Sequence, residues 1–117
     1  TTSPKPVLKR DWLKERVHVS AIGAFSPDWR ELDTATVAES KLVIDDMEGI
    51  ELEAGDILIP IEEGAITWDH VHAELKELVT RQKEGRTKED TITVFKSVGI
   101  AIQDSSVANL VLKKLGI

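Results

Sequence analysis

Three short apolar runs constrain the fold of this chain more than any other feature of its sequence. They span residues 18–23, 42–44 and 91–95, and β-branched residues are frequent in all three. Each run ends at a glycine, at a pair of aspartates or at a Lys-Ser-Val-Gly segment, as a strand does where it enters a loop. Continuous apolar runs of this length are typical of parallel strands covered on both faces. The sequence therefore predicts a buried parallel sheet.

Helical patterns separate these runs, so the order of elements predicts an α/β domain. Asp33 is placed to cap a short helix reaching Lys41, because its carboxylate can accept amide hydrogens of the first turn. Thr67 is placed to cap a second helix, in which apolar side chains recur at helical spacing. These side chains are Val71, Leu75, Leu78 and Val79.

A third helix is expected at the end of the chain, where Gly116 stands as a stop. Its beginning is open, because Asp104 could cap it or the helix could start near Gly99. The apolar side chains of this helix are Val107, Leu110, Val111 and Leu115.

Pro60, Gly64 and Gly85 mark expected loops, and the charged segment 83–90 is expected to be a surface connection. The acidic segment 45–56 is expected to be a solvated loop. It does not match a calcium-binding EF-hand loop. Aligning Gly49 or Gly55 with the required glycine places an isoleucine where the first oxygen ligand belongs.

Composition excludes several classes of protein. A chain of 117 residues is long enough for one domain, and the absence of cysteine excludes disulfides and thiolate chemistry. The lack of cysteine fits a cytoplasmic protein. A formal net charge of −6 disfavours nucleic-acid binding, and no apolar run approaches the ~20 residues of a membrane span. His70 and His72 would point away from each other on a helix, so we expect no metal site.

The common catalytic and nucleotide-binding motifs are absent from the chain. It contains no G-x-G-x-x-G fingerprint, no Walker loop, no nucleophile elbow and no tyrosine. Ligands of open α/β sheets bind beyond the carboxyl ends of the strands. The positions of interest are therefore residues 23–29, 45–48 and 96–99.

These strand-end loops resemble those of one family. The matching segments are residues 19–24, 27–33, 43–46, 53–56, 73–75 and 91–99, with Ala101, Asp104, the opening Thr-Thr-Ser and Trp12 also in place. Most specific are Pro-Asp-Trp-Arg-Glu-Leu-Asp at 27–33 and Phe-Lys-Ser-Val-Gly at 95–99. Over its whole length, and in this order, the chain is similar to the ornithine cyclodeaminase/mu-crystallin family.

The resemblance implies a fold and a position within it. The chain would be the C-terminal half of a Rossmann-type NAD(P)-binding domain, with parallel strands alternating with helices. Residues 1–117 would form a partial dinucleotide-binding domain, and the glycine fingerprint and the N-terminal dimerisation and substrate domain would lie outside it. A half-sheet of this kind exposes apolar surface. We therefore expect pairing with the missing N-terminal half or with a second copy.

The resemblance also implies an activity. Family members include alanine dehydrogenase, ketimine reductase, pyrroline-carboxylate reductase and ornithine cyclodeaminase. The complete protein would use NAD or NADP, act on a small imino, keto or amino acid, and form a homodimer. This chain alone would be inactive, because the cations that hold a substrate carboxylate would come from the absent half.

Five residues are implied as cofactor contacts: Thr1, Thr2, Ile22, Gly23 and Ser97. The two threonines would line the cofactor cleft, Ile22 and Gly23 would bring their backbone close to the nicotinamide, and Ser97 would hydrogen-bond to it. A second interpretation of Ser97 is a turn hydroxyl that bonds within its own loop.

Phe25 and Glu53 are implied on the substrate side. Cyclodeaminases carry an aspartate where this chain has Phe25, and a phenyl ring cannot exchange a proton. This favours the dehydrogenase and ketimine reductase branches over ornithine cyclodeamination. A mu-crystallin-like protein that binds cofactor and ligand without turnover is the alternative. Glu53 could equally be a solvated loop carboxylate.

Overall fold

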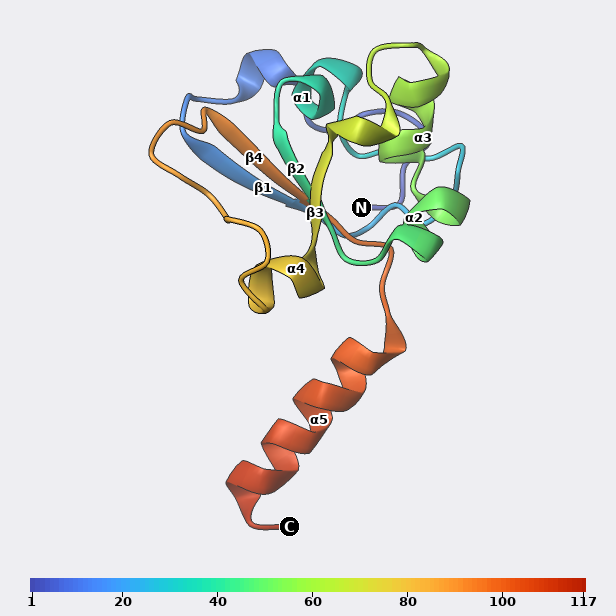
Figure 1. Ribbon diagram of the computed structural model, residues 1–117. Helices are drawn as coiled ribbons and strands as arrows, with labels where there is room; N and C mark the ends of the chain where they lie inside the picture. Colours follow the sequence, from blue (N-terminus) through green and yellow to red (C-terminus); the bar gives the residue numbers. More distant parts are fainter.

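The computed structural model describes all of residues 1–117, and its centre is a four-stranded parallel sheet (Figure 1). The strand order is β1-β4-β2-β3, so β4 lies between the first two strands of the chain. The predicted strands at the three apolar runs are confirmed. The bounds are β1 (Val17–Ala21), β2 (Lys41–Ile44), β3 (Val71–Glu74) and β4 (Ile92–Lys96).

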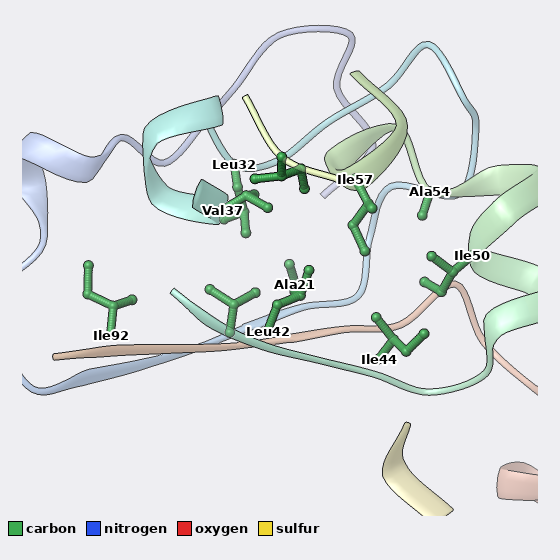
Figure 2. Packing of buried hydrophobic residues seen from close by; sticks show 11 residues of the cluster. Ala21, Leu32, Val37, Leu42, Ile44, Ile50, Ala54, Ile57 and Ile92 are labelled. Carbon is green, nitrogen blue, oxygen red and sulfur yellow. The ribbon is translucent and has the colours of Figure 1, made fainter. Parts of the chain in front are cut away.

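Helices connect these strands and cover one face of the sheet. Figure 2 shows the side chains of that face packed beneath the short helices. In chain order the helical elements are η1 (Arg10–Trp12), α1 (Thr34–Ala38), α2 (Met47–Glu53), α3 (Gly55–Glu62), η2 (Trp68–His70), α4 (Leu75–Val79) and α5 (Ala101–Leu115). None of them combines the length and apolar character needed to cross a bilayer.

The alternation of side chains along the strands builds the core. Leu42 and Ile44 from β2 and Ile92 and Val94 from β4 are almost completely buried, because they point toward the helices. They pack with Ile57 of α3 in one cluster (Figure 2). Burial of each such side chain contributes on the order of 2 kcal/mol.

The other face of the sheet is open, so the expectation of strands covered on both faces is wrong. Val43 and Phe95 point to this face and are only partly buried. They line a groove of about 280 Å³ with Leu75 and Leu78 of α4. The apolar surface expected of a half-sheet is thus present.

Helix α5 extends away from the sheet (Figure 1), and none of its residues is buried. It begins after Ile100, which agrees with the predicted start near Gly99 and not with a cap at Asp104. It stops at Gly116, whose φ is 72°. Its exposed apolar side chains include Val107, Leu110, Val111 and Leu115.

The helix predicted after Thr67 is wrong over most of its length. Thr67 is followed by the single 3-10 turn η2, residues 71–74 form β3, which pairs with β2, and only Leu75–Val79 is α-helical. Side chains at positions 71, 75 and 78 fit a helical period by coincidence. Pairing with the exposed edge of β2 decides the conformation instead.

Three further expectations are corrected. Lys41 begins β2 and does not end α1, which stops at Ala38. Pro60, expected in a loop, is a buried residue inside α3. The acidic segment 45–56 is no solvated loop, because it contains α2 and the start of α3, and both Asp45 and Asp56 are buried. Gly64 and Gly85 lie outside the helices and strands, as expected.

Gly55 is required by a close approach of two backbone segments. A Cβ at this position would lie 2.1 Å from the Trp29 carbonyl oxygen, whereas a Cβ at Gly85 would meet nothing within 4 Å. We expect Gly55→Ala to lower the free energy of unfolding of the complete protein by about 2 kcal/mol or more. Gly85→Ala, the matched control, should change it by less than about 0.5 kcal/mol. Urea unfolding measures both, and equal stability of the two variants would contradict the close approach.

Asp33 caps α1 as predicted, and its carboxylate accepts the Thr36 amide at 3.0 Å. Burial alone would raise the pKa of Asp33. The bonds from the Thr36 hydroxyl and amide and from the Arg10 amide outweigh burial, so the pKa lies below its ordinary value.

A lowered pKa gives this cap a defined pH dependence. Its stabilising contribution is complete above the ordinary pKa and is lost as pH falls through the lowered one. We expect Asp33→Ala to cost about 1 kcal/mol at pH 7. The difference from wild type should shrink in acid when unfolding is followed at several pH values. A difference that grows in acid would show that the carboxylate is not the capping species.

Candidate functional site

The carboxyl ends of β1, β4 and β2 meet at one edge of the sheet. The Ser97 amide donates to the Ala21 carbonyl at 3.1 Å, and the Asp45 amide donates to the Lys96 carbonyl at 3.1 Å. The loops that follow these strands therefore start side by side. In an open parallel sheet this is the edge where ligands bind.

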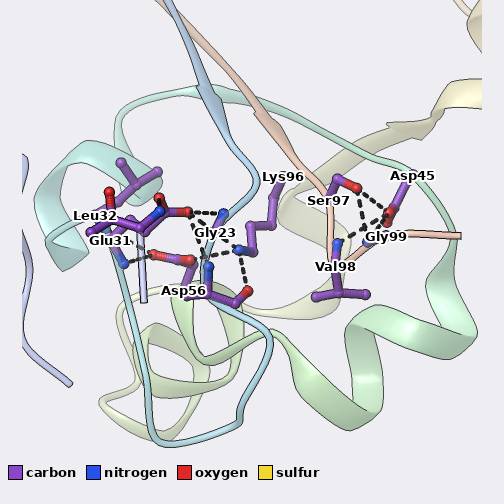
Figure 3. A network of polar contacts seen from close by, with 11 residues as sticks. Gly23, Glu31, Leu32, Asp45, Asp56, Lys96, Ser97, Val98 and Gly99 are labelled. Atoms are coloured by element: carbon purple, nitrogen blue, oxygen red, sulfur yellow. Dashed lines mark hydrogen bonds and ion pairs between the residues drawn. The ribbon is translucent and has the colours of Figure 1, made fainter. Parts of the chain in front are cut away.

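Lys96 points into the protein at this edge. Ile92 and Val94 face the core four and two residues earlier, so the alternation of β4 turns Lys96 inward as well. Its side chain is 0% exposed. Its Nζ atom donates to the Ala24 carbonyl at 2.7 Å and lies 2.9 Å from Asp56 Oδ2 (Figure 3). A buried ammonium needs such partners, since desolvation without them is costly.

Two buried carboxylates complete the network. Asp56 Oδ1 accepts the amides of Glu31 and Leu32 at 2.7 and 2.8 Å. Glu31 Oε2 accepts the amides of Gly23 and Ala24 at 2.8 and 3.3 Å, and it lies 3.7 Å from Lys96 Nζ. Through Glu31, the 27–33 motif is thus hydrogen-bonded to the start of the loop that follows β1.

Hydrogen bonding shifts the titration of Glu31. Burial by itself would raise its pKa. Hydrogen bonds from the Thr1 nitrogen and from the amides of Gly23 and Ala24 hold the pKa of the carboxylate below its ordinary value, with a further contribution from Lys96. The carboxylate is therefore ionised at neutral pH and acts as an acceptor only.

A second network surrounds Asp45, on the other side of β4 (Figure 3). Asp45 Oδ2 accepts the Ser97 hydroxyl at 2.5 Å and the amides of Val98 and Gly99 at 3.1 and 3.2 Å. Ser97 Oγ in turn accepts the Gly99 amide at 3.0 Å. Ser97 therefore has the geometry of a turn hydroxyl, and one lone pair of its oxygen has no protein partner.

The five residues implied as cofactor contacts lie near this edge or in segments next to it. Gly23 and Thr1 touch, because a Cβ on Gly23 would lie 1.5 Å from the Thr1 nitrogen. Thr2 and Ile22 are exposed, and Ser97 is buried, with 3% of its surface exposed.

The two residues implied on the substrate side lie apart from these networks. Phe25 is half-exposed and meets Trp29 edge to face, with ring centroids 6.2 Å apart. Glu53 is exposed at the end of α2. No contact joins Glu53 to the strand-end loops.

Sequence reasoning missed the charged residues that organise the edge. Lys96 and Asp45 lie in ranges that the sequence marked as positions of interest, and Glu31 and Asp56 lie in matching motifs, but none of the four was assigned a role. The two aspartates were expected in a solvated loop. One signal was available, because the two-residue period of β4 places Lys96 on the same face as Val94. A lysine on a core-facing position calls for a buried carboxylate.

Two of the three histidines bond to the backbone, whereas His18 bonds to the Thr93 hydroxyl at 2.8 Å. His70 Nε2 lies 2.9 Å from the Val37 carbonyl, and His72 Nε2 lies 2.8 Å from the Glu84 carbonyl. His72 is in β3 rather than in the helix assumed above. No three metal-binding side chains gather anywhere in the chain.

Comparison with known proteins identifies the family. The profile of the ornithine cyclodeaminase/mu-crystallin family matches residues 1–116. The chain belongs to this family. It is 40% identical over 111 residues to an alanine dehydrogenase of Archaeoglobus fulgidus, covering 95% of this chain and 34% of that protein.

Two solved structures share the fold. The Δ1-pyrroline-2-carboxylate reductase of Thermococcus litoralis in complex with NADH and L-proline gives a TM-score of 0.89 at 46% identity. That match covers 100% of this chain and 37% of that protein. An archaeal alanine dehydrogenase dimer with bound NAD gives a TM-score of 0.83 at 36% identity, over 98% and 37% of the two chains.

These matches confirm the predicted fold class, the C-terminal half of a Rossmann-type domain with parallel strands and alternating helices. The chain spans about a third of the length of these relatives.

The Asp45 network predicts a local effect. We expect Asp45→Ala to leave the Val98 amide without an acceptor and the Gly99 amide with Ser97 Oγ alone, at a cost of about 2 kcal/mol in the complete protein. Hydrogen exchange should become faster at residues 97–99. Asp28→Ala, an exposed control, should leave exchange there unchanged. Unaltered exchange in Asp45→Ala would show that the carboxylate does not hold the loop.

Proposed function

We propose that the complete protein transfers hydride between NAD(P)H and a small imino, keto or amino acid. The observation that carries this proposal is the match of the whole chain, at 46% identity and a TM-score of 0.89, to a reductase whose structure contains NADH and L-proline. Oxidoreductases with these cofactors place hydride chemistry on the cofactor, and the protein binds and orients. The substrate and the choice between NAD and NADP belong to this proposal.

The strand-end loops fit such a cofactor. The packing of Gly23 against Thr1 leaves no room for a side chain, which is typical of a place where backbone segments approach a ligand closely. We assign Thr1, Thr2, Ile22 and Gly23 to the wall of the nicotinamide side. The unused lone pair of Ser97 limits that residue to accepting a hydrogen bond, for example from a carboxamide NH₂ group.

The remaining parts of the site are assigned to the rest of the protein. Because the chain spans about a third of its relatives, we place the glycine fingerprint and the substrate-binding cations in a preceding segment. We further propose that the complete protein is a cytoplasmic homodimer. In support, the matching archaeal alanine dehydrogenase structure is a dimer. The open sheet face and α5 leave apolar surface for such contacts.

A binding protein without turnover is the second candidate. On the loop after β1, the exposed ring of Phe25 meets the partly buried ring of Trp29 edge to face, and such a pair suits an apolar or aromatic ligand. Phe25 also cannot serve as the acid that cyclodeaminases carry at this position. Turnover of imino acids with NADH or NADPH separates this candidate from a reductase.

Cofactor binding tests the proposal directly. We expect titration calorimetry to show binding of NADH or NADPH by the complete protein and none by the 117-residue chain. The reason is that the pyrophosphate-binding segment lies outside this chain. A gene sequence with G-x-G-x-x-[GA] about 60–80 residues before Thr1 would support the same conclusion. The proposal fails if the complete, folded protein binds neither cofactor.

A further inference from the structure

We propose that Lys96, Glu31 and Asp56 are positioning residues that hold the backbone of Gly23 and Ala24 beside the nicotinamide of the bound cofactor. The inference rests on the proposed function, and it adds a role for three buried charges that lie behind the cofactor-facing surface. We call this group the Lys96 clamp.

The clamp holds three of the four polar backbone atoms of this dipeptide. Lys96 Nζ donates to the Ala24 carbonyl at 2.7 Å. Glu31 accepts the Gly23 amide at 2.8 Å and the Ala24 amide at 3.3 Å. All three bonds are charge-assisted, so they are stronger than neutral hydrogen bonds and fix the loop from two sides.

Asp56 fixes the clamp itself. It accepts the amides of Glu31 and Leu32 and lies 2.9 Å from Lys96 Nζ. Its own backbone belongs to the first turn of α3, and Gly55, the first residue of that helix, packs on the carbonyls of residues 26, 27 and 29. The loop after β1 is therefore tied to β4 and to α3 at once (Figure 3).

Stability alone does not account for buried charges at this place. Position 96 continues the core-facing row of Ile92 and Val94, where an apolar side chain would fit the pattern. Replacing a buried ion pair by apolar packing is often neutral or stabilising. A directional, charged group here does what an apolar one cannot, because it sets the position of a carbonyl and two amides.

That position matters for a reductase. The clamped dipeptide directly follows Ile22 and packs against Thr1, two residues assigned to the nicotinamide wall. A misplacement of about 1 Å near reacting groups can lower a rate by on the order of a hundredfold. The clamp should therefore affect binding of the nicotinamide half of the cofactor and leave the adenosine half unaffected.

The test uses the complete protein and two ligands. NADH contains the nicotinamide, and ADP-ribose lacks it; with an NADPH-specific protein, NADPH and 2′-phospho-ADP-ribose replace them. We expect Lys96→Met to weaken NADH binding about tenfold, since the Ala24 carbonyl loses a charged donor. Binding of ADP-ribose should change less than about twofold. Calorimetry gives both dissociation constants, and their ratio is unaffected by a simple loss of folded protein.

Glu31→Gln is the second variant, chosen because it keeps the shape and one oxygen acceptor of the side chain. We expect a smaller loss of NADH affinity, about threefold, with ADP-ribose unchanged. This variant decides the question if Lys96→Met does not fold. Lys83→Met and Glu39→Gln make the same chemical changes on exposed side chains and should leave the ratio at its wild-type value.

The possible failures are distinguishable. If the folded wild-type protein binds neither NADH nor NADPH, the proposed function is overturned, and the clamp's role with it. If wild type binds NADH and the folded variants lose NADH and ADP-ribose affinity equally, or keep both, the clamp is structural only and this inference is overturned. A loss restricted to NADH supports it.

Discussion

A lysine ammonium lies completely inside this protein, at the carboxyl end of the central strand β4, and the arrangement of the ligand-binding edge depends on it. An unpaired charge in such a place would cost several kcal/mol. The chain therefore brings Asp56, Glu31 and the Ala24 carbonyl to Lys96, although 72 residues separate Ala24 from Lys96. Meeting this one requirement joins the loop after β1, the 27–33 motif and the start of α3.

The residue that directly follows β4 organises the opposite side of the strand. Ser97 and the two amides that follow it bond to Asp45, which stands directly after β2. Two successive residues at the end of β4 thus anchor two different loops. Both anchors lie behind the edge of the sheet. At this edge the backbone of the loops is held in place by buried polar side chains.

The structure also shows which apolar surfaces of this chain are left uncovered. One sheet face is covered by α1, α2 and α3, while the other face and the whole of α5 carry apolar side chains without cover. Strand β1 is an edge strand with one free side. These features agree with a chain that spans about a third of its relatives.

The sequence by itself determined the parallel strands, the cap at Asp33, the stop at Gly116 and the family, because these depend on local residue patterns and on motif order. It did not determine β3, whose four residues become a strand only by pairing with β2. It also did not determine the conformation of the acidic segment 45–56 or the burial of its aspartates. Whether an aspartate is solvated or buried depends on what lies opposite it, and the cation opposite Asp56 is 40 residues away in the chain. Only the tertiary structure decided that pairing, because desolvation and long-range contact leave no local pattern in a single sequence.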